Sequence, residues 1–262
     1  MNAELKGRTA LVTGATSGIG KGVAQAVAAA GAHVIIHGRN ASRGAEVADG
    51  IISAGGAASF VPADLADGAS AITVLIARAA DLAGAPIDIL VNNAAYLVGQ
   101  TTTTDTTEAM IDAALAVSIK APILLTAALV PAMTAAGGGV IINMGSINGI
   151  AGMAKTALYS ATKSAVHGLT RALAAEYGPA GIRVNAIAPG PTLTDITQAH
   201  RAFLDPLIAT LPSRGLQHPG PDRRDRRLPG QRRRRQHPRG HHLRGRRLHR
   251  HLKSTHSIPG SI

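Results

Sequence analysis

The stretch that decides the fold class is "TALVTGATSGIGK", residues 9–21. A short β-branched run leads into a turn that contains Gly14, Gly18 and Gly20, and an Ala-rich segment from about Ile19 to Ala30 favours a helix. Glycines allow φ > 0 and close backbone approach, while a helix N-terminus offers N–H groups and a positive dipole end to a pyrophosphate. The pattern predicts a dinucleotide site, although a tight structural turn would also use glycine.

Five more short apolar runs follow this first one along the chain, at residues 33–37, 58–62, 88–92, 139–144 and 183–188. Their nearly continuous apolar character is typical of parallel strands that helices cover on both faces. The intervening segments are long enough for crossover helices. The sequence therefore predicts an α/β protein with a Rossmann-type, doubly wound parallel sheet, in a single domain over residues 1–212.

The end of the second predicted strand indicates which dinucleotide would bind. An acidic residue there accepts the 2′-hydroxyl of NAD, whereas an arginine meets the 2′-phosphate of NADP. This chain has Gly38 and Arg39 in "HGRN", with Lys21 nearby in the glycine turn. NADP(H) is favoured over NAD(H), with the alternative that Arg39 is a solvated loop residue.

A second motif, "YSATK", places Tyr159 four residues before Lys163. On a helix this spacing brings the phenol and the ammonium to one face. A nearby cation lowers the pKa of a phenol, so that the pair can act as a general acid/base near neutral pH. Ser146, in "NMGSING" after the fifth predicted strand, lies at the carboxyl edge of the sheet, where open α/β proteins bind ligands.

With these motifs the chain resembles the short-chain dehydrogenase/reductase family. The matching segments are "TGATSGIG" at 13–20, Asp64 and Leu65, "NNAA" at 92–95, Ser146, "YSATK" at 159–163 and "RVNAIAPG" at 183–190. They occur in the family's order and spacing over roughly residues 5–200. The resemblance implies an oxidoreductase that interconverts an alcohol and a carbonyl compound, both small molecules, and that forms a homotetramer or dimer where the C-terminus is intact.

The resemblance also implies a role for each matching residue. Tyr159 would exchange a proton with the substrate oxygen, Ser146 would hydrogen-bond that oxygen, and Lys163 would lower the pKa of Tyr159 and hold the nicotinamide ribose. The other implied cofactor-binding residues lie in the glycine turn, at the ends of strands and after the last strand: Gly14, Thr16, Ser17, Gly18, Ile19, Gly20, Arg39, Asp64, Leu65, Asn92, Ala94, Pro189, Gly190, Thr192 and Thr194.

One position departs from the family pattern. The family usually has an asparagine where this chain has Ser118, and that asparagine helps to position a water joined to the lysine. Serine keeps a hydroxyl but is shorter, so an impaired proton relay is one interpretation of the difference. The other is that Ser118 is simply a helix residue whose role a water replaces.

The charge of the chain divides at about residue 213. Residues 213–262 hold 15 of the 27 Lys and Arg residues and two of the 15 acidic residues, which gives this tail a net charge of +13 and residues 1–212 a net charge of −1. After Ser213 there is no Ala, Val, Phe, Tyr, Met or Trp. A segment with so little to bury is not expected to pack.

Two origins for this basic tail are open. Arg-, Pro-, Gly- and His-rich runs are typical of GC-rich DNA read out of frame, and a back-translation read one base later from Pro219 can give the helix, strand and "DGG" turn that the family resemblance leads us to expect. This favours a shifted reading frame between about codons 213 and 219. Binding of nucleic acid by the cations is the alternative; it is not favoured, because the tail has no aromatic residue to stack on bases.

Other composition features exclude whole classes of chemistry. There is no cysteine, so neither disulfides nor thiolate catalysis is available. The longest apolar run, "APILLTAALVPAM", is shorter than the roughly 20 residues of a membrane span, and the start shows no signal peptide. A cytoplasmic protein without a membrane partner is expected. The scattered residues His33, His37, His167 and His200 lack metal-ligand spacing, so no metal site is predicted.

Overall fold

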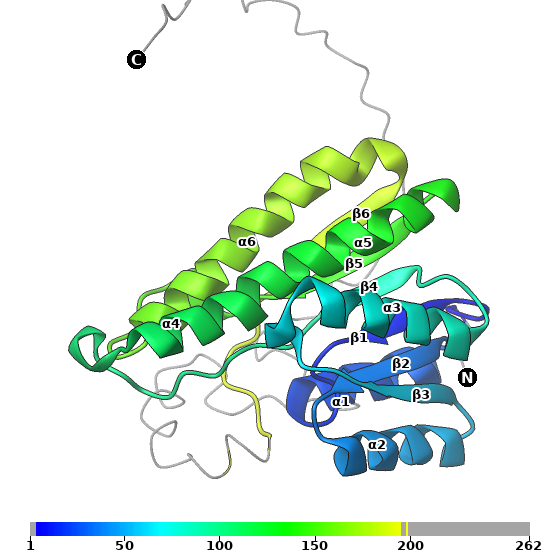
Figure 1. Cartoon of the computed structure of the whole chain (residues 1–262), viewed down its shortest axis with the longest axis horizontal. Helices are drawn as coiled ribbons and strands as arrows, with labels where there is room; N and C mark the ends of the chain where they lie inside the picture. The colour runs from blue at the N-terminus through cyan, green and yellow to red at the C-terminus, as the bar shows by residue number, and fades with distance from the viewer. Residues whose placement is uncertain (1–3, 195–197, 199–262) are drawn as a thin grey trace, which may run out of the picture. The chain divides into compact units, whose positions relative to one another are not determined.

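The structure, a computed structural model of the whole chain, describes residues 4–194 and residue 198. Its centre is a sheet of six parallel strands in the order β3-β2-β1-β4-β5-β6 (Figure 1). Each predicted strand is confirmed to within one residue at either end: β1 Thr9–Val12, β2 His33–Gly38, β3 Ala57–Pro62, β4 Ile89–Asn92, β5 Gly139–Met144 and β6 Ile182–Ile187. The predicted Rossmann-type doubly wound fold is therefore confirmed.

Helices connect successive strands. They are α1 Gly18–Ala29, α2 Ala41–Ser53, α3 Ala69–Ala83, α4 Glu108–Leu115, α5 Ala121–Ala135 and α6 Ala157–Tyr177. Local sequence explains where several begin and end, because Asn40 and Thr107 cap α2 and α4 by accepting hydrogen bonds from the third residue of each helix. Gly84 ends α3 in the left-handed conformation that glycine adopts without strain.

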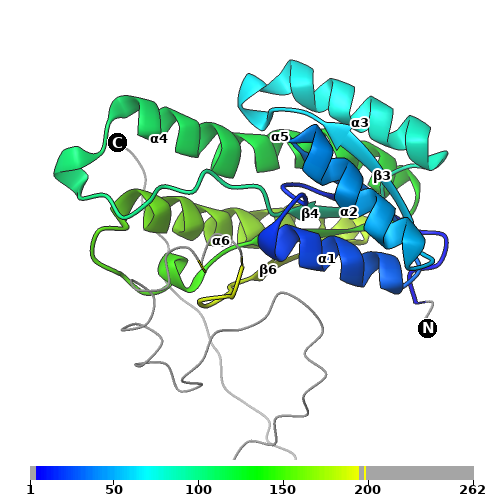
Figure 2. The same cartoon turned by 90° about the horizontal axis from the view of Figure 1, so that it is seen from below.

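The helices cover the two faces of the sheet with separate hydrophobic cores (Figure 2). On one face, α3, α5 and α6 pack over a core that includes Leu11, Leu75, Leu125 and Ile141. On the other face, α1 and α2 pack over a core built from alternate residues of the same strands, such as Val12 and Ile36. Because successive side chains of a strand point to opposite faces, β1 to β5 supply both cores, whereas the core residues of β6, Ile182 and Val184, belong to the first core alone.

The connections diverge between β1 and β4. From β1 the chain runs outward to β2 and β3, and after β3 it crosses back to β4 on the other side of β1. At such a switch point the loops after neighbouring strands leave in opposite directions and open a crevice at the carboxyl edge. The glycine turn after β1 and the "NNAA" segment after β4 both lie at this crevice.

Strand β6 pairs with β5 from Ile182 opposite Gly139 to Ile187 opposite Met144. Ile187 is 48% exposed, although it stands in a strand of an α/β sheet that helices normally cover on both faces. Residues 195–197 and 199–212, the predicted domain boundary near residue 213 and the basic tail lie outside the described residues.

The helical stretch Glu108–Ala135, which joins α4, a π-helical turn Ala116–Lys120 and α5, has 28 residues and a mean hydropathy of 2.0. By length and composition alone it meets the requirement for a membrane span. In the fold, however, its buried residues Ala121, Leu125, Leu129 and Met133 belong to the core between the sheet and the layer of α3, α5 and α6. Core packing thus explains the hydrophobicity of its buried residues, whereas Ile111, Leu115 and Ile123 of the same stretch are exposed.

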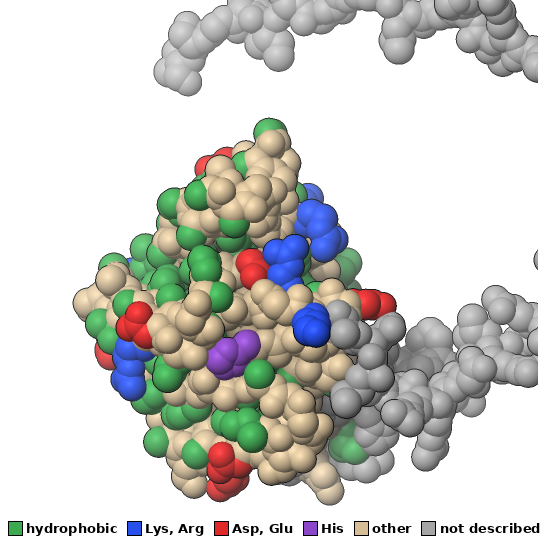
Figure 3. All heavy atoms as spheres, turned by 90° about the vertical axis from the view of Figure 1, so that its right-hand side faces the viewer, with side chains coloured by type: hydrophobic (Ala, Val, Ile, Leu, Met, Phe, Trp, Pro, Cys, Tyr) green, Lys and Arg blue, Asp and Glu red, His purple; other side chains and the backbone are tan. Residues whose placement is uncertain are grey.

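The face drawn in Figure 3 carries acidic and basic side chains scattered among apolar and uncharged atoms, and in places an acidic side chain lies directly beside a basic one. One ion pair of the described residues joins Arg8 before β1 to Asp88 before β4, with 3.8 Å between Nη1 and Oδ1. Because Asp88 also accepts a hydrogen bond from the Thr9 amide, it ties the amino ends of β1 and β4 together.

Candidate active site

The glycine turn is shaped by close packing as well as by its backbone angles. Gly14 and Gly18 adopt φ of 62° and 55°, which side-chain-bearing residues rarely do. A Cβ on Gly14 would lie 2.9 Å from the Ala94 Cα, and one on Gly20 would lie 2.3 Å from the Gly14 carbonyl oxygen. Packing of the fold itself therefore requires glycine at Gly14 and Gly20, whereas a Cβ on Gly18 would meet no atom closer than 3.5 Å.

A side-chain bracket holds this turn against the end of β4. The Thr13 hydroxyl accepts hydrogen bonds from the amides of Asn93 and Ala94, at 3.0 Å each, and donates to the Val91 carbonyl. The side-chain Nδ2 of Asn93 donates to the carbonyls of Thr13 and Gly14, at 2.9 and 3.0 Å. Asn93 was not among the predicted site residues, although its place beside Asn92 in "NNAA" was a signal for it.

Asn92 itself lies in the sheet interior. Its Nδ2 donates to Asn143 Oδ1 on β5 at 2.9 Å, and Asn143 in turn donates to the Thr170 hydroxyl on α6 at 3.0 Å. The side chain of Leu65 also faces the interior, because this residue is 4% exposed in the core formed around Leu11 and Ile141. Contacts of these two predicted residues with a cofactor would therefore use their backbone atoms.

Three of the four predicted catalytic residues, Ser146, Tyr159 and Lys163, come together from two elements, and the fourth, Ser118, lies outside the lining of the cavity that they share. Ser146 follows β5 as the cap of a short 3₁₀ turn, where its hydroxyl accepts the Asn148 amide hydrogen at 3.2 Å. Tyr159 and Lys163 lie one turn apart on α6, with the Lys163 ammonium 5.7 Å from the centre of the Tyr159 ring. Ser146 and Lys163 are 7% and 5% exposed.

The electrostatics of the trio differ from the sequence prediction. Burial raises the pKa of Tyr159, and hydrogen bonding with Ser146 opposes that rise. The Lys163 ammonium donates instead to the Met144 carbonyl at 2.7 Å, and burial lowers its pKa from 10.5 to about 8. The expected lowering of the Tyr159 pKa by Lys163 is therefore not found, because burial has the larger effect on Tyr159 and on Lys163 alike.

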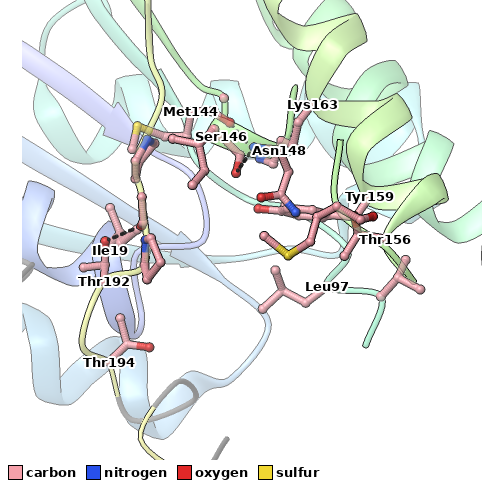
Figure 4. Close-up of a pocket in the computed structure, with 18 of the residues that line it drawn as sticks. Ile19, Leu97, Met144, Ser146, Asn148, Thr156, Tyr159, Lys163, Thr192 and Thr194 are labelled. Atoms are coloured by element: carbon pink, nitrogen blue, oxygen red, sulfur yellow. Dashed lines mark hydrogen bonds between the residues drawn. The ribbon is translucent and has the colours of Figure 1, made fainter. Parts of the chain in front are cut away.

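A cavity of about 650 Å³ opens over the trio and reaches the glycine turn. Figure 4 shows Tyr159 and Thr156 across it from Ile19 and Thr192. The predicted residues that line it, among those described, are Ile19, Ser146, Tyr159, Lys163, Pro189, Gly190, Thr192 and Thr194. Leu97 and Met153, which the sequence did not single out, add apolar wall, and a hydrogen bond from the Thr101 amide to the Lys155 carbonyl joins the two loops that carry them.

Comparison with known proteins shows to which family the chain belongs. The family described as short chain dehydrogenase matches residues 8–205, which span the sheet, the glycine turn and the Ser146, Tyr159 and Lys163 positions. The chain belongs to the short-chain dehydrogenase/reductase family. As in other oxidoreductases of this family, a nicotinamide dinucleotide cofactor and a small alcohol or carbonyl substrate are the expected ligands.

Individual relatives act on varied molecules. Galactitol 2-dehydrogenase (L-tagatose-forming) of Cereibacter sphaeroides is 42% identical over 197 residues, which cover 74% of this chain and 74% of the relative. The structure of a 3-oxoacyl (acyl-carrier-protein) reductase from Agrobacterium tumefaciens with NADP bound is 35% identical, with a TM-score of 0.77 over 83% of this chain and 85% of that one. A 7α-hydroxysteroid dehydrogenase complexed with NADH and 7-oxo glycochenodeoxycholic acid is 32% identical, with a TM-score of 0.78 over 83% and 85%.

A second, polar hollow of this short-chain dehydrogenase/reductase lies at the end of β2. Thr16 and Ser17 of the glycine turn line it together with Arg39, Asn40 and Arg43. Arg39 Nη1 lies 3.6 Å from Asp64 Oδ2, and both groups are accessible to solvent. The structure thus brings together four predicted residues, Thr16, Ser17, Arg39 and Asp64. It adds Asn40 and Arg43, and the place of Arg43 in the first turn of the helix after β2 was the signal that sequence reasoning missed.

Ser118, where the family usually has asparagine, lies in the π-helical turn between α4 and α5. It is 3% exposed, and its hydroxyl accepts the Tyr96 amide hydrogen at 3.2 Å. Ser118 therefore holds the loop after β4 against the long helix. This contact gives the residue a structural role and does not decide whether the proton relay is impaired.

The histidines of the described residues make hydrogen bonds within the fold. His33 bonds Ser59, His167 bonds the Ser146 carbonyl, and His37 bonds Gly14 and Ala63. Over residues 4–194, no group of three His, Asp or Glu side chains is arranged to hold a metal ion. His200 lies outside the described residues.

Proposed function

We propose that the protein is an NADP(H)-dependent oxidoreductase that interconverts an alcohol and a carbonyl compound, with Tyr159 as the general acid/base. The observation that carries this proposal is the meeting of Ser146, Tyr159 and Lys163 at one cavity that also reaches the glycine turn. A proton-transferring phenol, a hydroxyl donor and a cation at the carboxyl edge of a Rossmann-type sheet suit carbonyl reduction.

The residues would share the chemistry as follows. A bound nicotinamide supplies or accepts the hydride. In the direction of reduction, the Tyr159 hydroxyl donates its proton to the carbonyl oxygen, and Ser146 stabilises the charge that develops there by donating a hydrogen bond. The raised pKa of Tyr159 keeps the phenol protonated at neutral pH, which suits the reductive direction before a cofactor binds.

Lys163 would support Tyr159 electrostatically. Its ammonium is held by the Met144 carbonyl, 5.7 Å from the Tyr159 ring centre, and remains a cation below its lowered pKa of about 8. A phenolate formed during turnover would be stabilised by this charge, because Lys163 is 5% exposed and water screens a buried charge only weakly. The lowering of the Tyr159 pKa is thus assigned to the reacting complex.

The preference for NADP(H) is proposed from the hollow after β2. Arg39 and Arg43 both face it, and planar guanidinium groups suit phosphate oxygens. The ion pair between Arg39 and Asp64 is weak because both groups are exposed, so the guanidinium could exchange the carboxylate for a phosphate at little cost.

The test is the oxidation of NADPH and of NADH by the purified protein with a panel of aldehydes and ketones. Tyr159→Phe should lower turnover at least a hundredfold, as expected for loss of a general acid, while NADPH binding persists. Tyr177→Phe, at the far end of the same helix, is the matched control. Retained turnover in Tyr159→Phe would refute the assigned role, and NADPH binding without turnover in the unaltered protein would identify a catalytically impaired cofactor-binding protein.

Cofactor choice is tested by Arg39→Asp. Loss of a charge-assisted bond to a phosphate is worth about 1.5–3 kcal/mol, so NADPH affinity should fall by about tenfold or more, while NADH affinity stays equal or rises. Arg78→Asp, at an exposed arginine of α3 on the other face of the sheet from α2, serves as the charge-matched control. Unchanged affinities for both cofactors would show that Arg39 is a solvated loop residue.

Self-association is proposed to use the long helix. Ile111, Leu115 and Ile123 are 38–44% exposed along α4, the π-helical turn and α5. Three large aliphatic side chains on one helical stretch are suited to pairing with a second copy. Sedimentation of the protein with Ile123→Asp should shift the equilibrium toward monomers; an unchanged oligomer would place the contact elsewhere.

We also propose that the basic tail reflects a shifted reading frame, in the gene or in its sequence. The family match ends at residue 205, before the change in composition near residue 213. Sequencing of codons 205–255 from freshly isolated DNA decides the point. One base fewer would restore the "DGG" ending, and an unchanged sequence would leave a chain whose activity has to be measured as it stands.

A further inference from the structure

His37 lies near the carboxyl end of β2 and is 3% exposed. Its Nδ1 is 3.3 Å from the Gly14 amide nitrogen, and its Nε2 is 3.2 Å from the Ala63 carbonyl oxygen. An amide N–H can only donate and a carbonyl can only accept, so both bonds form together in one neutral tautomer, with the proton on Nε2. The imidazole therefore bridges two backbone segments that lie 49 positions apart in the sequence.

The environment of the ring keeps it in this neutral form. Burial lowers the pKa of His37 to about 4, and the Ala63 hydrogen bond and the nearby Asp64 carboxylate only partly oppose that effect. The backbone of His37 reinforces the same contact, because its carbonyl accepts the Ala15 amide hydrogen at 2.9 Å. Both amides at the start of the glycine turn are thus bonded to one residue.

The two bridged segments belong to different parts of the proposed cofactor site. Gly14 opens the glycine turn that leads to Ser17 and the first turn of α1. Ala63 precedes Asp64, which pairs with Arg39 beside the polar hollow after β2. One ligand that spans both regions binds well only if their separation is fixed before it arrives, because ordering a loop on binding weakens affinity.

We propose that His37 is a positioning residue for the adenosine half of the cofactor, bracing the glycine turn at Gly14 against the Ala63–Asp64 segment. This inference rests on the proposed dinucleotide function. The imidazole touches neither the cavity over Tyr159 nor the polar hollow, whose lining residues do not include it. It acts through the backbone that it holds.

Two variants distinguish the effect of the His37 hydrogen bonds from the effect of its packing. His37→Leu fills the site with an apolar side chain of similar size and removes both hydrogen bonds. His37→Asn keeps an oxygen near the Nδ1 position, able to accept from Gly14, but is too short to reach Ala63. His33→Leu is the matched control, since His33 lies at the other end of the same strand and bonds a side chain, Ser59, rather than the glycine turn.

The measurement is the affinity of the full chain for adenosine 2′,5′-bisphosphate and for NADPH by calorimetry, with urea unfolding of each variant alongside. We expect His37→Leu to weaken both ligands by about tenfold, from the loss of a bond that leaves buried backbone groups unpaired. His37→Asn should recover part of this loss, and His33→Leu should bind as the unaltered protein does. Where His37→Leu does not fold, His37→Asn carries the comparison with an expected intermediate loss.

Equal affinities in a folded His37 variant and the unaltered protein would overturn the inference and leave His37 as a core residue. A loss of unfolding free energy with unchanged ligand affinity would overturn it as well. Failure of the unaltered protein to bind NADPH or NADH would instead count against the proposed dinucleotide function, so the two failures are distinguishable.

Discussion

Replacement of Lys163 by methionine should stabilise the cofactor-free protein at neutral pH while abolishing turnover. The ammonium is 5% exposed and has one hydrogen bond among the described residues, to the Met144 carbonyl. Its pKa falls from 10.5 to about 8 on folding. At about 1.4 kcal/mol per pKa unit, burying this charge costs about 3 kcal/mol. Methionine has a similar shape without the charge.

The net gain follows from two opposing contributions. Loss of the charge-assisted hydrogen bond to Met144 offsets about 1.5–3 kcal/mol of this cost, so Lys163→Met should raise the free energy of unfolding by about 1 kcal/mol or less at pH 7. Between pH 8 and pH 10.5 the unfolded chain binds more protons at this lysine than the folded chain does. Stability of the unaltered protein therefore rises with pH in this window, and the stability of the variant relative to the unaltered protein should fall by about 2 kcal/mol between pH 7 and pH 9.5.

Urea unfolding of both proteins at pH 7.0 and pH 9.5 gives these differences directly, and other titrating groups cancel between the two proteins. Lys6→Met, at an exposed lysine before β1, is the control and should show no such change with pH. A variant that is less stable than the unaltered protein at pH 7, or a difference that does not change with pH, would refute the reasoning. Confirmation would mean that the protein retains a costly buried cation for its chemistry.

Three further outcomes are expected from urea unfolding. Gly20→Ala should lower the free energy of unfolding by about 1–3 kcal/mol, because its Cβ would lie 2.3 Å from the Gly14 carbonyl oxygen. Gly50→Ala in α2, where nothing lies within 4 Å, should raise the free energy of unfolding by about 0.5–1 kcal/mol. Equal effects of the two variants would refute the packing account. Ser118→Ala should lose about 1–2 kcal/mol by leaving the Tyr96 amide unpaired, and no loss would show that this bond is unimportant. Neutral, buried His37 stabilises the fold fully above its ordinary pKa of 6.5, and this stabilisation is lost as the pH falls toward about 4. Between pH 7.5 and pH 5 the free energy of unfolding of the unaltered protein should therefore fall by about 2 kcal/mol relative to that of His37→Asn. Parallel pH profiles of the two proteins would contradict the buried neutral ring.

Much of the candidate site was predictable because its signals are local. The spacing of Tyr159 and Lys163 puts them on one helical face wherever the helix packs, and Ser146 follows an apolar run that could only be a buried strand. The preference for NADP(H) stays a prediction. In the sequence it rests on Arg39 alone, a cation after a predicted strand. Arg43 lines the same hollow only because α2 begins directly after β2, which a local pattern does not reveal.

The amino-acid sequence by itself determined the six strands, the crossover helices and the glycine turn, since apolar periodicity and glycine conformation act over a few neighbouring residues. Tertiary structure alone decided that the Lys163 ammonium would bond Met144, that Asn92 would turn inward to Asn143, and that His37 would bridge Gly14 and Ala63. These contacts join residues 19 to 51 positions apart. They depend on strand register and on which polar groups burial leaves in need of a partner, and neither can be deduced from a local pattern.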